Sequence, residues 1–263
     1  MRHLHARLAL ALASAPLLQS CLSVRADEPA SVGASVNVGT AYWFRGVPVN
    51  TGGVIQGDLA TTLPLADGSL LDLSVWGNMA LTGDSGNGIE PDGNGLAFTE
   101  IDTVAVYTRS YDGYDVSVGI LSYNLPNGVG ASTTELYSAA SFQALGLSHA
   151  LSVYYDFDLL DGFYMAYSGG WGRTLDDKTA LDVAWNLGAM GGDQARGYFG
   201  VDENGLSDLS LSGTLSHAFD PATTLSATLA LIKTLDSDYA DALDAAGRDD
   251  LGVVVMVGTA WSF

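Results

Sequence analysis

The sequence predicts an all-β fold, a single twelve-stranded antiparallel up-and-down transmembrane β-barrel. Three observations predict it. Apolar residues recur at every second position instead of with helical spacing, twelve segments show this alternation, and the links between them differ systematically in length. In "DLSLSGTLSHAF" (208–219), for example, Leu209, Leu211 and Leu215 alternate with small polar residues. Several segments exceed ~10 residues, which suits a tilted membrane strand better than a strand of a soluble sandwich.

The N-terminus has the pattern of an export signal. Arg2 and Arg7 precede a short apolar run, and "VRA" (24–26) fits a small-residue cleavage site. We therefore expect residues 1–26 to be a cleaved signal peptide and residues 27–263 to form the outer-membrane barrel. An alternative remains open, because "LQSC" resembles a lipoprotein box that would be cleaved before Cys21. Cys21 is the only cysteine, so the barrel is expected to contain no disulfide.

The charge balance excludes one class of partner. The chain has 10 Lys+Arg and 30 Asp+Glu, a formal net charge of -20. A nucleic-acid partner is not expected, because binding phosphates requires a basic face.

Twelve segments carry the period-two pattern and give the predicted strands in order. They are 34–47, 54–64, 69–82, 98–110, 114–125, 133–144, 148–158, 163–175, 179–190, 206–219, 223–235 and 250–263.

The links between these segments predict how the barrel is oriented. The three long links, 83–97, 191–205 and 236–250, all follow odd-numbered strands, whereas tight turns such as "LADGS" (65–69) follow even-numbered ones. Outer-membrane barrels have short periplasmic turns and longer external loops. We therefore expect the protein in the outer membrane of a Gram-negative-type bacterium, with both termini periplasmic.

The last segment, "LGVVVMVGTAWSF" (251–263), predicts closure of the barrel. Pairing with the first segment would leave no open edge in the lipid. The ending resembles the C-terminal signal read by the barrel-assembly machinery, through Gly258, Trp261 and Phe263, although Met256 stands where that pattern usually has a polar residue. The same outward parity predicts aromatic girdles at Tyr42, Phe44, Tyr107, Tyr155, Phe157, Tyr167 and Trp171.

The opposite face of each strand predicts the lumen. Its acidic residues outnumber the single cation, Arg45, which either neutralises acids in a plugged barrel or lies in an acidic, cation-favouring constriction. Its aromatic residues could stack on a flat or sugar-like solute or fill space. The predicted pore-lining residues are Trp43, Arg45, Gln56, Asp58, Trp76, Asn78, Glu100, Asp102, Tyr123, Glu135, Tyr137, Tyr154, Asp156 and Asn186.

One stretch resembles a known family. "VGTAYWFRGVPV", followed by "GGVIQGDLAT" and "LDLSVWGNMAL", is similar to the start of the TorF-type porins, whose first strand carries a Tyr-x-Phe-Arg-Gly pattern. Tyr42, Phe44, Arg45 and Gly46 match it. The match covers about the first third of the chain. The resemblance implies an outer-membrane barrel with a porin role and no known solute.

Catalysis and metal binding are not expected. After the signal, only His149 and His217 remain, without a nucleophile partner or metal-ligand spacing. The acidic stretches 84–95 and 236–244 lack the full spacing of a calcium loop, so solvated loops are favoured, although such loops could bridge to lipopolysaccharide through divalent ions.

The predicted function is therefore that of a channel. We expect passive diffusion of small hydrophilic solutes through a narrow acidic lumen, with no cofactor and with outer-membrane lipid as surroundings. The alternative is a non-conducting barrel that serves as an anchor, scaffold or surface-binding protein. That alternative requires paired acids, or a loop such as 83–97 or 191–205 folded inward.

Overall fold

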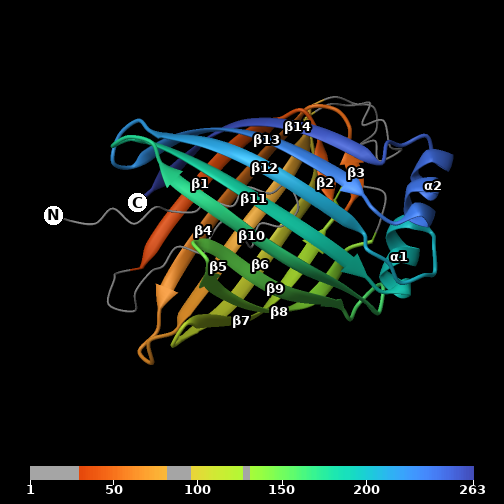
Figure 1. The fold of residues 1–263 in the computed structure, drawn as a ribbon, viewed down its shortest axis with the longest axis horizontal. Helices are drawn as coiled ribbons and strands as arrows, with labels where there is room; N and C mark the ends of the chain where they lie inside the picture. The colour runs from red at the N-terminus through yellow and green to blue at the C-terminus, as the bar shows by residue number, and fades with distance from the viewer. Residues whose placement is uncertain (1–29, 82–95, 127–130) are drawn as a thin grey trace.

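The computed structural model describes residues 30–81, 96–126 and 131–263. The predicted signal peptide, Cys21 and the acidic stretch 84–95 lie outside the described residues. Within them, twelve antiparallel strands form one closed barrel, which confirms the predicted fold class (Figure 1).

The barrel strands follow one another around the wall in chain order, and the last strand pairs with the first. Val38 of the first strand lies opposite Ile55 on one side and Val257 on the other. The barrel strands are β1 (Ser31–Gly39), β4 (Val54–Pro64), β5 (Leu70–Ala80), β6 (Ala97–Tyr111), β7 (Tyr114–Asn124), β8 (Thr133–Ala144), β9 (Leu147–Asp156), β10 (Gly162–Thr174), β11 (Thr179–Met190), β12 (Asp208–Ala218), β13 (Thr223–Thr234) and β14 (Leu251–Ser262).

The two ends of the barrel differ. The start of β1 and the end of β14 lie at one end, which we call the terminus end, and two short helices lie at the other, the loop end (Figure 1). The helices are α1 (Gly192–Phe199) and α2 (Ser237–Ala245). Neither of these described helices has the length and apolar character needed to cross a membrane.

Large apolar side chains cover the outside of the wall. A continuous apolar band of this kind is unfavourable in water and is the expected outer face of a barrel in lipid. The protein is thus an outer-membrane-type β-barrel. Exposed members of the band include Val36, Leu59, Val75, Val118, Leu136, Leu151, Met165, Leu211, Leu229 and Val255. Among the predicted girdle aromatics, Tyr155, Phe157, Tyr167 and Trp171 are exposed and Tyr107 is half-buried.

The first predicted strand, 34–47, is wrong beyond Gly39. The chain leaves the wall there and forms a separate two-stranded hairpin, β2 (Tyr42–Phe44) and β3 (Val47–Asn50). Its turn residues, Arg45 and Gly46, have φ values of 49° and 85°. Positive φ at both central residues is the geometry of a tight two-residue hairpin turn. The wall therefore ends at Gly39, and the predicted outward placement of Tyr42 and Phe44 is wrong, because both are buried.

Local interactions determine where α2 begins and where α1 ends. The carboxylate of Asp236 accepts hydrogen bonds from the backbone N–H groups of Asp238 and Tyr239 and so caps the start of α2. Helix α1 ends at Gly200, whose left-handed conformation terminates the helix. The two helices meet through stacked rings of Phe199 and Tyr239, whose centroids are 4.6 Å apart.

Candidate functional site: an arginine-bearing hairpin inside the barrel

The β2–β3 hairpin lies inside the loop end of the barrel. Tyr42, Trp43, Phe44, Arg45 and Val47 are all buried, and their partners come from strands on several sides of the wall. Trp43 and Arg45, predicted as parts of the wall, instead project from this inserted hairpin, so that prediction of their setting is wrong.

The guanidinium group of Arg45 is the centre of the site. Its Nη1 and Nη2 donate to the two carboxylate oxygens of Glu135 on β8, each at 2.6 Å. Tyr123 on β7 donates its hydroxyl to the same carboxylate at 2.9 Å. Both members of the ion pair are almost completely buried, with exposed side-chain fractions of 2% and 1%. A two-pronged pair of this kind fixes orientation as well as distance.

Aromatic rings surround the same guanidinium. Its central carbon lies 4.7 Å from the ring centroid of Phe44, 4.8 Å from that of Tyr154 and 4.5 Å from that of Tyr164. A cation at this distance from a ring is attracted by the ring's quadrupole, more strongly where water is excluded. Arg45 therefore lies in a cage made of one carboxylate and several rings.

Helix α1 closes the cage from the loop end. In the orientation that satisfies both of its amide atoms, Gln194 accepts from Nη1 of Arg45 at 3.1 Å and donates to the carbonyl of Gly162 at 3.2 Å. The ring of Tyr198 lies 5.9 Å from that of Phe44. Arg248, which follows α2, donates to the carbonyl of Pro48 at 2.9 Å. Residues of α1 and of the segment after α2 thus contact the hairpin at the loop end, while the wall strands contact it from around the lumen.

The other face of the hairpin packs on β12, β13 and β14. Trp43 belongs to an apolar cluster with Ala41, Ala230, Ile232 and Val254. The backbone of Gly252 on β14 lies against the indole ring of Trp43, and a Cβ at that position would overlap it. The hydroxyl of Thr234 donates to the carbonyl of Gly46 at 2.7 Å. These contacts leave the tip of the hairpin little freedom to shift.

Two acidic residues on β6 share the interior with Arg45. Glu100 accepts a hydrogen bond from Tyr42. Asp102 is repelled by the negative charges of Glu100 and Glu135 and attracted by the positive charge of Arg45. Both carboxylates are buried, and Oδ1 of Asp102 has no hydrogen-bond partner among the described residues. Arg45 is the single buried cationic side chain in the described ranges, so the interior carries a surplus of acids.

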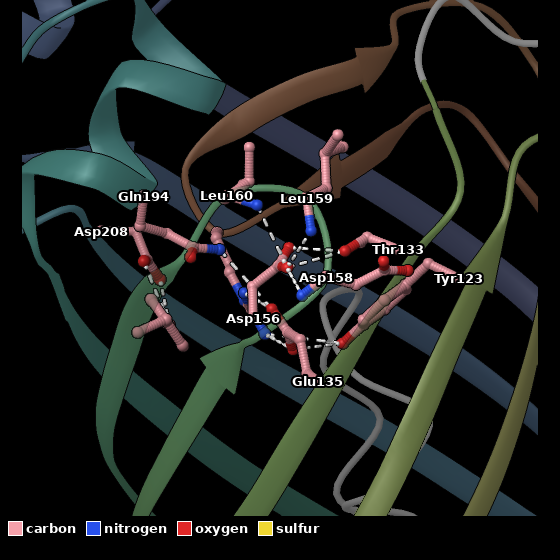
Figure 2. A network of polar contacts seen from close by, with 11 residues as sticks. Tyr123, Thr133, Glu135, Asp156, Asp158, Leu159, Leu160, Gln194 and Asp208 are labelled. Atoms are coloured by element: carbon pink, nitrogen blue, oxygen red, sulfur yellow. Dashed lines mark hydrogen bonds and ion pairs between the residues drawn. The ribbon is translucent and has the colours of Figure 1, made fainter.

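Two further buried acids have local structural roles. Asp156 accepts from the hydroxyl of Thr133 and from the backbone N–H groups of Asp158, Leu159 and Leu160, so it organises the turn after β9 (Figure 2). Asp208 accepts from Ser207, Tyr164 and Asn186, the last at 3.0 Å. Both carboxylates have several partners, whereas Oδ1 of Asp102 has none among the described residues.

Polar side chains also form a ladder along β4 to β6, close to the loop ends of these strands. Gln56 donates to Asn78 at 3.1 Å, and Asn78 donates to Thr99 at 2.7 Å. Asp58 lies opposite Trp76 in the strand register, and both are half-buried instead of fully buried. The interior is therefore more open beside Asp58 and Trp76 than around Arg45.

The predicted pore-lining residues thus fall into two groups. Twelve of them lie on wall strands, and ten of these are buried: Gln56, Asn78, Glu100, Asp102, Tyr123, Glu135, Tyr137, Tyr154, Asp156 and Asn186. The structure also brings Gln194, Tyr198 and Asp208 to the site, none of which the sequence assigns to the lumen. A role in lining a pore stays a prediction for all of these residues.

Other predicted features have clear locations. The stretch 236–244 is largely helix α2, with Asp236 as its cap and Tyr239 and Leu243 buried, so the solvated loop favoured by the sequence is wrong there. No group of three or more His, Cys, Asp or Glu residues in the described part of the chain is arranged to hold a metal ion. His149 contacts the hydroxyl of Tyr167 at 2.8 Å, and His217 contacts that of Thr179 at 3.1 Å. These contacts form no serine–histidine pair.

Comparison with solved structures finds other barrels of similar architecture. A KdgM porin in complex with disordered oligogalacturonate is 13% identical and has a TM-score of 0.49, covering 89% of this chain and 99% of that chain. A NanC porin is 12% identical with a TM-score of 0.49, covering 88% and 98%. LpxR from Salmonella typhimurium is 10% identical with a TM-score of 0.48, covering 87% and 99%. These likenesses concern the barrel fold and assign no solute or activity. No family model and no curated protein matches this chain.

Proposed function

We propose that this chain is an outer-membrane channel for passive diffusion of small hydrophilic solutes, with an acidic lumen that the β2–β3 hairpin closes at the loop end. The observation that carries the proposal is the surplus of buried acids, with Glu100 and Asp102 beside the already paired Arg45. An acidic wall favours cations over anions.

The proposed placement follows the asymmetry of the barrel. The terminus end faces the periplasm and the loop end faces outward, in the outer membrane of a Gram-negative-type bacterium, because short turns are periplasmic in such barrels. Gly258, Trp261 and Phe263 serve as the signal for the barrel-assembly machinery. The exposure of Trp261 and Phe263 near the end of β14 supports this assignment. The TorF-type family is the proposed affiliation, on the Tyr42 to Gly46 pattern.

A second candidate is a non-conducting barrel that acts as an anchor, scaffold or surface-binding protein. The inserted hairpin and the bidentate pair between Arg45 and Glu135 favour it, because both are features of a plug. The two candidates differ in whether the hairpin ever leaves the lumen.

Ion selectivity tests the proposal. The mature protein is reconstituted in a planar bilayer, and the reversal potential is measured in a KCl gradient for the wild type and for a Glu100→Gln/Asp102→Asn variant. We expect cation-selective current in the wild type and a shift of the reversal potential toward zero in the variant. A silent bilayer containing demonstrably folded and inserted protein would overturn the proposal and favour the plug.

A further inference from the structure

The cage around Arg45 is built mostly from groups that do not belong to the hairpin. Glu135, Tyr123, Tyr154 and Tyr164 project from β7 to β10, and Gln194 comes from α1. Figure 2 shows Glu135, Tyr123 and Gln194 converging on one point from these separate elements. If the hairpin is withdrawn, these groups remain as a preformed cavity wall with a carboxylate at its base.

The chemistry of this wall matches one kind of ligand. A planar guanidinium can donate two parallel hydrogen bonds to a carboxylate and present its face to aromatic rings at the same time. The Glu135 carboxylate receives two such bonds here, each of 2.6 Å, and the two tyrosine rings on β9 and β10 lie within 4.8 Å of the guanidinium carbon. An alkali ion, or an alkylammonium group with its point charge, cannot reproduce this combination.

The backbone conformation at Arg45 indicates that an arginine is not the residue the turn itself favours. Arg45 has φ = 49°, a left-handed conformation in which glycine, asparagine and aspartate are favoured. A long side chain with a Cβ is unfavourable at this position unless its contacts compensate. The contacts that compensate are those of the cage.

We propose that the wall side of this cage is a binding site for guanidinium-bearing solutes, and that Arg45 occupies it as a tethered internal ligand. A solute with a guanidinium group would compete with Arg45 for Glu135 and the rings of Tyr154 and Tyr164. Displacement of Arg45 would break the link between the hairpin tip and β8, while the contacts of Trp43 and Gly46 with β13 and β14 stay. The inference rests on the proposed function, because it names the solute class that the channel admits.

Competition with a tethered group sets the expected behaviour. The hairpin keeps Arg45 at a high effective concentration beside Glu135, so a free solute binds the wild type weakly. Removing the Arg45 side chain should expose the site. The Arg45→Gly variant does so while it keeps the turn, because glycine favours the positive φ at this position.

The test measures binding without current. Mature Arg45→Gly protein is refolded in detergent micelles, and its thermal unfolding is followed at rising millimolar methylguanidinium, with NaCl and methylammonium chloride at matched ionic strength as reference salts. Because a ligand that binds only the folded state stabilises it, we expect a saturable rise in Tm with methylguanidinium alone. Arg45→Gly/Glu135→Gln should bind at least about tenfold more weakly, since the charge-assisted fork is lost.

A matched control separates the cage from a general effect. Arg248→Ala removes a guanidinium that contacts the same hairpin through the carbonyl of Pro48, outside the cage. We expect no saturable response in Arg248→Ala. The proposal is overturned if methylguanidinium raises the Tm of Arg45→Gly no more than NaCl does. It is also overturned if Arg45→Gly/Glu135→Gln or Arg248→Ala responds as strongly as Arg45→Gly.

The result stays distinguishable from the test of the proposed function. Saturable binding in a protein that never conducts would support the cage as a ligand site in a non-conducting barrel. Cation-selective current in a protein whose Arg45→Gly variant does not bind methylguanidinium would support the channel and overturn the assignment of its solute class.

Discussion

Arg45 and Glu135 lie 90 residues apart in the sequence, yet two hydrogen bonds of 2.6 Å join them inside the barrel. Arg45 belongs to the hairpin that follows β1, and Glu135 belongs to β8, across the barrel from β1. The pair therefore ties an inserted hairpin to the far wall, and both side chains are almost completely buried. Much of the behaviour that we expect of this protein depends on that link.

Removal of one partner of the pair should destabilise the barrel strongly. In Glu135→Gln the Arg45 guanidinium stays buried without its counter-charge, which costs about 3 kcal/mol or more. An Arg45→Met/Glu135→Leu variant should lose less than Glu135→Gln, because no charge is left unpaired. Urea unfolding of refolded protein in lipid vesicles, followed by tryptophan fluorescence, measures both.

An exposed ion pair provides the control for this comparison. Arg196 of α1 pairs with Asp193 at 2.9 Å, with both side chains more than half exposed. Arg196→Ala should change the free energy of unfolding far less than Glu135→Gln does, because water and salt screen an exposed pair. Equal losses of unfolding free energy in Glu135→Gln and Arg196→Ala would show that the buried pair contributes no more to stability than the exposed pair.

Gly252 should be intolerant of any side chain. A Cβ on this residue would overlap the indole of Trp43, so Gly252→Ala must push the hairpin away from β14 or distort the strand. We expect a loss of about 1–3 kcal/mol, typical of overpacking. The control is Gly213→Ala on β12, where a Cβ would meet nothing within 4 Å. Urea unfolding that finds the two variants equally stable would contradict the packing of Trp43 on β14.

Acid should loosen the turns at the terminus end. Backbone N–H groups of Ala222 and Lys178 hydrogen-bond the carboxylates of Asp220 and Asp176, respectively, and lower the pKa of each aspartate. Because the folded pKa lies below the unfolded value of about 3.9, the stabilisation is present above that value and is lost as the pH falls through the folded pKa. Amide hydrogen exchange at Ala222 and Lys178, corrected for intrinsic rates, should therefore lose protection as the pH falls below about 4.

Asparagine variants test the cause. The amide oxygen of asparagine accepts the same backbone hydrogen bond without titrating, so Asp220→Asn should keep Ala222 protected at low pH while Lys178 still loses protection. Unchanged protection in the wild type from neutral to strongly acidic pH would contradict the role of the carboxylates.

The wall of the barrel could be predicted from the sequence because lipid imposes a simple rule. Residues such as Leu211 and Val255 must face hydrocarbon, and their neighbours must not, so a period of two persists along every strand. The alternation of short and long links added a prediction of which end of the barrel carries the tight turns and which carries the long loops. These signals depend on local pattern alone and need no knowledge of distant contacts.

The hairpin was missed because its alternation continues that of β1. Its turn is Arg-Gly instead of the more usual Asn-Gly, so the turn itself gave little warning. The run Tyr42, Trp43 and Phe44 gave little signal either, because consecutive aromatics also occur on a wall strand, as Tyr154 and Tyr155 do on β9. Gln194 and Tyr198 gave no signal, because their place in the site depends on how the loop between β11 and β12 folds over the barrel.

The central claim is that the β2–β3 hairpin closes the lumen, and single-channel conductance tests it most directly. Residues 42–50 are replaced by a Gly/Ser segment of the same length, which preserves the link between β1 and β4, and the variant is compared with the wild type in the same planar bilayers. We expect rare or small openings in the wild type and steady, larger, cation-selective conductance in the variant. Equal conductance in the two folded proteins would contradict the claim.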